Sequence, residues 1–167
     1  ELGDERDYYK EDSAVQRMIL RDIAEFSDFP QERIELGIDG CGVPVFAVPL
    51  HNMATSFVKL VAPELLQTPA LAHAAKRNVD IVSRHPENLM DATCGVLCRD
   101  PNIIGKVGAQ GVYTFGLKKE RLGFACKVYD GQSAYFPLII AHTLELLSYD
   151  NKETIERLRA AFPDEVT

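Results

Sequence analysis

A glycine-rich stretch places a carboxylate and a thiol two positions apart. Residues 39–42 read Asp-Gly-Cys-Gly, so Asp39 and Cys41 are the groups that could bind a metal. Glycines permit the sharp turn that would bring the two side chains together, and zinc accepts both carboxylate and thiolate ligands. Alternatively, Asp39 makes an Asx-turn and Cys41 is a buried apolar filler. The spacing therefore suggests two zinc ligands, which do not by themselves make a closed site.

A lysine between small residues is the second candidate. Lys106 lies in residues 105–111, which read Gly-Lys-Val-Gly-Ala-Gln-Gly. Small neighbours on a strand would let a substrate lie against the backbone, and the ammonium could pair with a carboxylate or lower the pKa of a nucleophile. The alternative is a solvated lysine that protects an edge strand against aggregation.

Cys41 could also be a nucleophile, with His51 or His142 as its base. Such a dyad requires the ring and the thiol to lie within hydrogen-bond distance, which the sequence does not determine. Ser13 is interpreted as a helix cap, and no serine is assigned as a nucleophile. The chain is therefore expected to carry a candidate active-site lysine without an attacking group of its own.

The other cysteines indicate packing. Cys94 and Cys98 would share one face of a helix, and Cys126 alternates with apolar residues in a strand, so we expect all three in the core. Sparse cysteines in apolar surroundings are typical of reduced thiols. We therefore expect a cytoplasmic protein.

Charge and hydropathy exclude several functions. The chain has 167 residues and a net charge of −7, from 18 basic and 25 acidic side chains. This excess of carboxylates repels nucleic acid and anionic lipid, and no apolar run approaches the roughly 20 residues that cross a bilayer. Residues 1–12 are acidic and do not resemble a signal peptide. Because the chain lacks an initiator Met, we expect it to begin inside a longer gene product.

Helices dominate the first hundred residues of the predicted structure. Ser13 and the apolar spacing after it predict a helix over about 13–27. Residues 37–50 predict a constrained loop with one short strand, followed directly by a helix. Two prolines, Pro69 and Pro86, each open a further helix; the inward face of the second would carry Met90, Thr93 and Leu97.

The later residues predict a small sheet. Residues 103–117 and 122–129 are rich in Val, Tyr, Phe and Gly and predict an antiparallel hairpin. Helical spacing returns over 134–148, and Asp150 could cap a last helix. We therefore predict an α+β fold in which helices cover a small antiparallel sheet. Residues 1–167 would form a single domain.

Three stretches resemble the L-asparaginase II family, amidohydrolases whose fold is similar to that of serine β-lactamases. Residues 37–44 read Gly-Ile-Asp-Gly-Cys-Gly-Val-Pro, with Ala-Val-Pro-Leu following at 47–50. The other stretches are residues 105–113, Gly-Lys-Val-Gly-Ala-Gln-Gly-Val-Tyr, and residues 127–131, Lys-Val-Tyr-Asp-Gly. The resemblance covers the C-terminal part of the family, so the nucleophile segment would lie upstream of Glu1.

The resemblance implies roles for five residues. Lys106 would be the active-site lysine, Gly40 and Gly108 would bind substrate, and Asp39 and Cys41 would supply half of a zinc site. The implied reaction is hydrolysis of L-asparagine to L-aspartate and ammonia, through an acyl-enzyme on a serine outside this chain.

The same resemblance implies the partners and leaves one alternative function. The partners would be the small-molecule substrate and the missing N-terminal half, with a homodimer left open. Zinc is the one cofactor that the resemblance allows. Residues 83–90 depart from the more glycine-rich segment of the family, which bears on substrate specificity. The alternative is a non-catalytic module that binds zinc or a small molecule.

Overall fold

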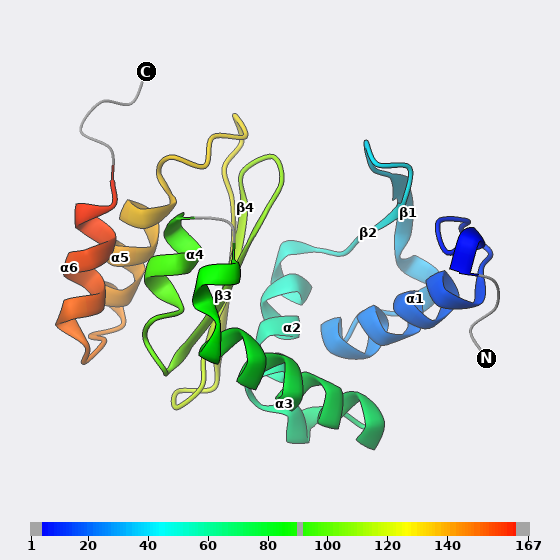
Figure 1. Ribbon diagram of the computed structural model, residues 1–167, viewed down its shortest axis with the longest axis horizontal. Helices are drawn as coiled ribbons and strands as arrows, with labels where there is room; N and C mark the ends of the chain where they lie inside the picture. Colours follow the sequence, from blue (N-terminus) through cyan, green and yellow to red (C-terminus); the bar gives the residue numbers. More distant parts are fainter. Residues whose placement is uncertain (1–4, 90–91, 163–167) are drawn as a thin grey trace.

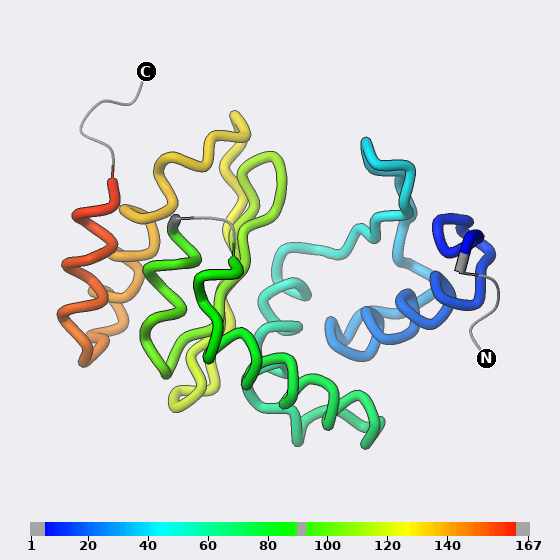
Figure 2. Tube along the Cα trace, viewed as in Figure 1, coloured from blue at the N-terminus to red at the C-terminus, as the bar shows by residue number. Residues whose placement is uncertain are grey.

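Helices lie on both faces of a three-stranded antiparallel sheet. The structure is a computed structural model that describes residues 5–89 and 92–162. Figure 1 shows α4, α5 and α6 on one side of the sheet and α2 and α3 on the other, and the same layers can be followed along the trace in Figure 2. The helices are α1 (Ala14–Ser27), α2 (Leu50–Val61), α3 (Pro69–Arg84), α4 (Ala92–Leu97), α5 (Phe136–Leu146) and α6 (Lys152–Ala160).

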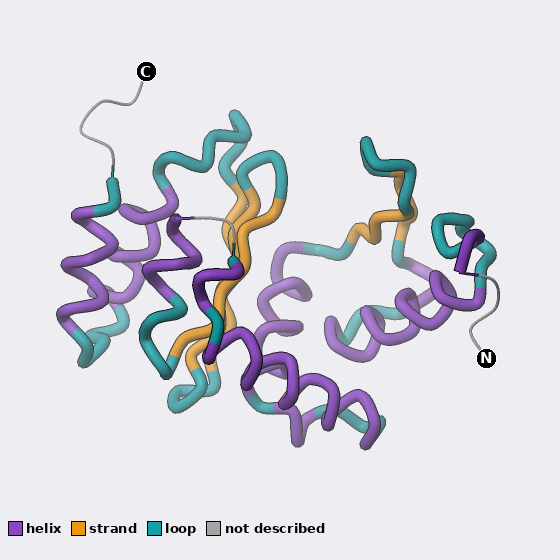
Figure 3. Tube along the Cα trace, in the orientation of Figure 1, coloured by secondary structure: helices purple, strands orange, loops and turns teal. Residues whose placement is uncertain are grey.

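The strands form two separate antiparallel units (Figure 3). Strands β3, β4 and β5 pair in the order of the chain, whereas β1 and β2 pair only with each other. Their bounds are β1 (Glu35–Ile38), β2 (Pro44–Ala47), β3 (Ile103–Gly108), β4 (Val112–Leu117) and β5 (Leu122–Lys127).

The main core lies between the three-stranded sheet and helices α4, α5 and α6. Side chains alternate across a strand, so one face of β4 presents large apolar residues to these helices. The ring of Tyr113 packs on Phe136 of α5 with centroids 5.1 Å apart. The buried residues of this core are Cys94, Leu97, Ile103, Tyr113, Phe115, Leu117, Phe136, Ile140, Ala141, Leu144, Tyr149, Ile155 and Leu158.

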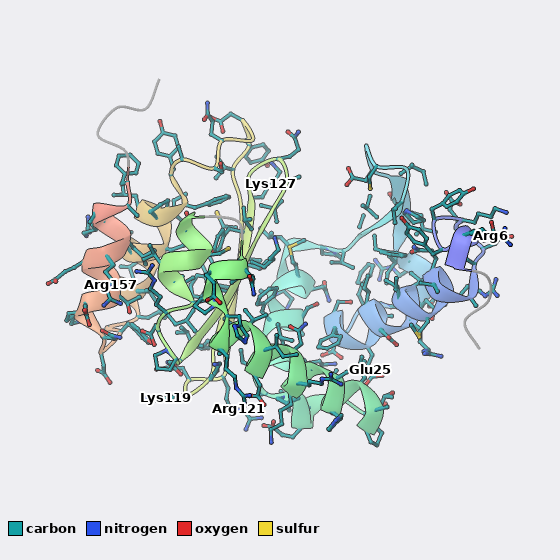
Figure 4. The ribbon with its side chains drawn as sticks, viewed as in Figure 1. Arg6, Glu25, Lys119, Arg121, Lys127 and Arg157 are labelled. Atoms are coloured by element: carbon teal, nitrogen blue, oxygen red, sulfur yellow. The ribbon has the colours of Figure 1, made fainter. Side chains whose placement is uncertain are left out.

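Polar contacts attach α1 to the helices beside it. The ammonium of Lys59, on α2, is buried and donates to the carbonyl oxygen of Glu25 at 2.6 Å and to the carboxylate of Asp28 at 2.5 Å. Asp28 ends α1 in the left-handed conformation. The carboxylate of Glu25 accepts hydrogen bonds from the residues that precede α3 (Figure 4). These contacts fix the C-terminal end of α1 against α2 and α3.

The structure confirms the α+β prediction, with helices covering small antiparallel sheets. The Ser13 hydroxyl accepts a hydrogen bond from the Gln16 amide and caps α1 as predicted. Pro69 is the first residue of α3, also as predicted.

The number of strands differs from the prediction in two segments. Residues 103–117 form two strands instead of one, because Gln110 (φ 55°) and Gly111 (φ 72°) make a left-handed turn between them. The loop over 37–50 contains one strand and the end of its partner, since β1 begins before it. The glycines that suggested a loop instead form the turn of a hairpin.

Two helix predictions also need correction. Pro86 opens only a short 3-10 turn, Pro86–Asn88, and α4 begins separately at Ala92. Thr93 is buried as expected, whereas Met90 lies outside the described residues. The cap of α6 is Asn151, whose side-chain oxygen accepts from the Thr154 amide, and not Asp150.

Candidate functional site

The turn between β1 and β2 presents Asp39 and Cys41 at the surface. The Asp39 amide donates to the Val43 carbonyl at 3.0 Å, and the Gly42 amide returns to the Asp39 carbonyl at 2.8 Å. Gly42 has a φ of 82°, a conformation that favours glycine. One carboxylate oxygen of Asp39 accepts from the Gly40 amide at 2.8 Å. The turn thus orients the Asp39 carboxylate locally.

Cys41 is exposed and not a buried filler, which removes the structural alternative for this thiol. Carboxylate and thiolate donors both fit zinc in type, but a tetrahedral site needs two further ligands. Among residues 5–89 and 92–162, no cluster of three His, Cys, Asp or Glu side chains is arranged to hold a metal ion. Asp39 and Cys41 could therefore supply two of the four ligands that such a site needs.

Lys106 lies in the middle of β3, directly opposite Thr114 of β4. Its side chain is exposed, and its ammonium donates to the Val107 carbonyl at 2.6 Å. The Thr114 hydroxyl donates to the Lys106 carbonyl at 3.3 Å. No carboxylate within the described parts of the chain forms an ion pair with this lysine. Its ammonium is therefore at the surface, where its contact within the described residues is with the backbone carbonyl of Val107.

The two glycines beside Lys106 differ in their surroundings. A Cβ on Gly105 would lie 3.0 Å from the Leu97 side chain and 3.1 Å from the Tyr113 hydroxyl, so a larger residue would require these side chains to shift. Gly108 is exposed, and its nearest neighbour would be Val112 at 3.1 Å. Gly40 has nothing within 4 Å of an added Cβ. Gly40 and Gly108 therefore leave their backbones accessible to a small molecule.

Lys106 and the Asp39–Cys41 turn lie on the same side of the three-stranded sheet. The alternation along β3 points Lys106 to the face on which α2 packs, and Figure 1 shows the β1–β2 hairpin on that side as well. Lys127, labelled in Figure 4, shares this face because it pairs with Val112 of β4. No hydrogen bond or ion pair joins Lys106 to Asp39 or Cys41 in the part that the structure describes.

The proposed cysteine–histidine dyads are not formed. His142 lies on α5, across the sheet from the hairpin, and its ring faces the Glu145 carboxylate at 3.6 Å. His51 lies in the first turn of α2, and no hydrogen bond links it to Cys41 among the described residues. Neither of the two predicted histidines therefore acts as a base for Cys41 in the part of the chain that the structure describes.

One spacing was missed by the sequence analysis. Ser56 and Lys59 are spaced as Ser-x-x-Lys, which in other proteins marks a nucleophile and its lysine. Here the Lys59 ammonium points to the end of α1, and the Ser56 hydroxyl donates to the Asn52 carbonyl at 3.1 Å. The spacing alone would have found the pair, but its contacts are those of helix packing.

A second serine–lysine contact could not be found from the sequence. The Lys118 ammonium donates to the Ser83 hydroxyl at 2.8 Å and to the Pro101 carbonyl at 2.7 Å. Burial lowers the pKa of Lys118. The contact joins the end of α3 to the turn after β4. This turn lies at the end of the sheet where β3 begins. We interpret it as a packing contact.

Comparison with known proteins agrees with the resemblance seen in the sequence. No described helix combines the length and the apolar character needed to cross a membrane. A search of curated proteins finds no match. The family model for L-asparaginase II matches residues 2–167, which include the Asp39–Cys41 turn and Lys106. The chain therefore belongs to the L-asparaginase II family, which supports an asparaginase-like, amide-hydrolysing function in general.

Proposed function

We propose that this chain is the C-terminal part of an enzyme that hydrolyses L-asparagine to L-aspartate and ammonia. The observation that carries the proposal is Lys106, an exposed ammonium without a carboxylate partner among the described residues, within a chain that matches the family over 2–167. Residues 1–167 would fold as one domain and act together with an upstream N-terminal half.

The proposed reaction begins with a serine outside this chain. Its hydroxyl attacks the side-chain amide carbon of asparagine, ammonia leaves, and an acyl-enzyme ester remains. Water then cleaves the ester, which releases aspartate and restores the serine. Lys106 would move protons to and from the reacting groups and stabilise the negative charge that develops on the amide oxygen.

Substrate would bind along exposed backbone. Gly40 and Gly108 offer accessible main chain on the side of the sheet that carries Lys106, as expected for residues that contact a small ligand. Asp39 and Cys41 would hold zinc together with ligands from outside this chain. The metal would organise the pocket for substrate recognition.

The other expectations stand as parts of this proposal. The four cysteines are free thiols, which supports a reducing compartment such as the cytoplasm. The net charge of −7 argues against nucleic acid and anionic membranes as partners. We propose the upstream half and L-asparagine as partners, and a homodimer as the assembly to look for.

The test is ammonia release from asparagine by the full-length protein. Lys106→Ala should reduce kcat by at least about a hundredfold, the effect of removing a group that moves a proton. Lys127→Ala is the matched control, because this lysine lies on the same sheet face and its ammonium also rests on the next carbonyl, at 2.5 Å. Unchanged turnover in Lys106→Ala would refute the assignment.

Two serine variants test where the nucleophile lies. Ser56→Ala and Ser83→Ala should both keep wild-type turnover, because their hydroxyls take part in packing contacts. Loss of turnover in either folded variant would place the attacking group inside this chain.

The second candidate is a non-catalytic binding module. It is favoured by one observation: the Ser56 hydroxyl donates to the Asn52 carbonyl and the Lys59 ammonium contacts the end of α1, so the Ser-x-x-Lys spacing does not form an activated pair. Calorimetry with zinc and with asparagine separates the two functions. Tight binding by a full-length protein that releases no ammonia would favour the module.

A further inference from the structure

Two sulfur atoms cover the edge of the strand that carries Lys106. Alternate residues of an antiparallel strand direct their amides to opposite edges. The Gly105 amide donates to the Cys98 sulfur at 3.2 Å, and the Val107 amide donates to the Cys94 sulfur at 3.2 Å. The amides on either side of Lys106 in the chain, which point away from β4, therefore both have a sulfur as hydrogen-bond acceptor.

Both thiols are built into the core. Cys94 is 0% exposed and Cys98 is 2% exposed, and they lie one helical turn apart at α4. Cys94 also accepts a hydrogen bond from the Tyr113 hydroxyl at 3.2 Å. A buried amide without a partner is destabilising, so Cys98 satisfies the buried amide of Gly105, and Cys94 satisfies the part-buried amide of Val107.

The Cys98 thiol has a second contact with the same residue. It donates to the Gly105 carbonyl at 3.7 Å while accepting from the Gly105 amide. Burial raises the pKa of this thiol to about 11, so it keeps the proton that it donates. A Cβ on Gly105 would lie only 3.0 Å from the Leu97 side chain, so helix and strand pack closely at this position. Helix and strand are therefore held in one relative position.

We propose that Cys94 and Cys98 are positioning residues for Lys106. They act through the strand: by fixing the amides of Gly105 and Val107, they fix the backbone from which the Lys106 side chain projects. This inference rests on the proposed catalytic role of Lys106. A displacement of about 1 Å at a reacting group can reduce turnover by about a hundredfold, so removing the sulfurs should affect kcat more than KM.

The experiment uses alanine and serine variants of both cysteines in the full-length protein. Alanine removes the acceptor, whereas serine keeps one of smaller size. Cys126 provides the matched control: it packs against the same core from β5, and no hydrogen bond from its sulfur to β3 occurs within the described residues.

Two readouts are measured below the unfolding temperature of each variant. With asparagine, Cys94→Ala and Cys98→Ala should lower kcat about tenfold to a hundredfold with little change in KM, and the serine variants should recover most of it. Hydrogen exchange followed by NMR should be at least about tenfold faster at Val107 in Cys94→Ala and at Gly105 in Cys98→Ala. Cys126→Ala should change neither readout.

The outcomes separate the inference from the proposed function. Wild-type kcat and wild-type exchange in the alanine variants would overturn the inference, as would an equal loss in Cys126→Ala. Lost amide protection with wild-type kcat would also overturn it, because the sulfurs would then be structural only. Retained turnover in Lys106→Ala would refute the function, while the exchange data would still decide whether the sulfurs hold β3.

An alanine variant that does not fold leaves the serine variant to decide. In Cys94→Ser and Cys98→Ser, kcat should then be lower than in the wild type by less than about tenfold. Amide exchange at Val107 and at Gly105, respectively, should be faster than in the wild type by less than about tenfold. A serine variant with altered exchange and unchanged kcat would count against the inference.

Discussion

Gly116 of β4 lies directly opposite Gly123 of β5, and helix α2 rests on both. A Cβ on Gly116 would lie 2.9 Å from the Phe57 carbonyl oxygen, and one on Gly123 would lie 2.0 Å from the Ala54 carbonyl oxygen. Both contacts are with helix backbone, which cannot rotate away as a side chain can. The paired glycines thus set the distance between α2 and the sheet face that also carries Lys106.

Gly123→Ala should therefore destabilise the protein strongly. The methyl group would force α2 away from the sheet, and overpacking of this kind costs at least about 2 kcal/mol in the free energy of unfolding. Urea unfolding followed by circular dichroism measures the change. Gly95→Ala is the control, because nothing lies within 4 Å of an added Cβ at that helical position; its stability should be equal or higher. Equal stability of the two variants would contradict the packing.

Asp100 joins the start of β3 to the start of α6. The carboxylate is 4% exposed and accepts hydrogen bonds from four donors. One oxygen accepts from the Asn102 amide at 3.0 Å. The other accepts from the Tyr149 hydroxyl at 2.9 Å, the Asn151 side chain at 2.9 Å and the Thr154 hydroxyl at 2.8 Å.

Asp100→Asn should lower the free energy of unfolding by about 2–3 kcal/mol, because an NH₂ group would replace an acceptor that faces donors. Asp150→Asn is the control: this aspartate is exposed and lies beside the same helix cap. Thermal unfolding of both variants measures the difference. A small effect at Asp100, similar to that at Asp150, would show that water replaces these contacts.

Glu25 makes stability depend on acid pH. Its pKa is lowered from the ordinary value of 4.5, first by the Thr68 hydroxyl and also by the Thr68 and Gln67 amides. Because the folded-state pKa is the lower one, the carboxylate stabilises the fold above pH 4.5 and loses this contribution as the pH falls through the folded pKa.

The variant Glu25→Gln should therefore be less stable than the wild type at pH 7, and the difference should shrink below about pH 4.5. Thermal unfolding across pH 3–7 measures it. Glu156→Gln, an exposed position on α6, should show no such pattern. A difference that is constant with pH would contradict the role of the charge.

Alkylation should distinguish the four thiols. Iodoacetamide should label Cys41 first, since it is exposed, and leave Cys94 and Cys98 unmodified in the folded protein. Burial raises the pKa of Cys98 to about 11 and raises that of Cys126 as well, so both carry less of the reactive thiolate. Peptide mass spectrometry measures the order. Labelling of Cys41 faster than that of a free cysteine would revive its role as a nucleophile.

Local signals predicted many of the elements correctly. A capping serine and apolar spacing predicted α1, and a first-turn proline predicted α3. These signals act over a few residues, so a single sequence contains them. The same locality explains the errors. Residues 103–117 were predicted as one strand, although Gln110 and Gly111 form a turn within them. Asp150 was predicted as the cap of α6, although its neighbour Asn151 takes that role.

For the candidate site, too, some features could be predicted from the sequence and others could not. The sequence by itself was enough to predict Asp39, Cys41 and Lys106 as candidate site residues, because they lie in short stretches that resemble one family. Only the tertiary structure decided that α4 places two thiols against the edge of β3 and that Glu25 holds the start of α3. Periodicity tells which face of an element is apolar, but the partner of that face depends on contacts between residues far apart in the chain.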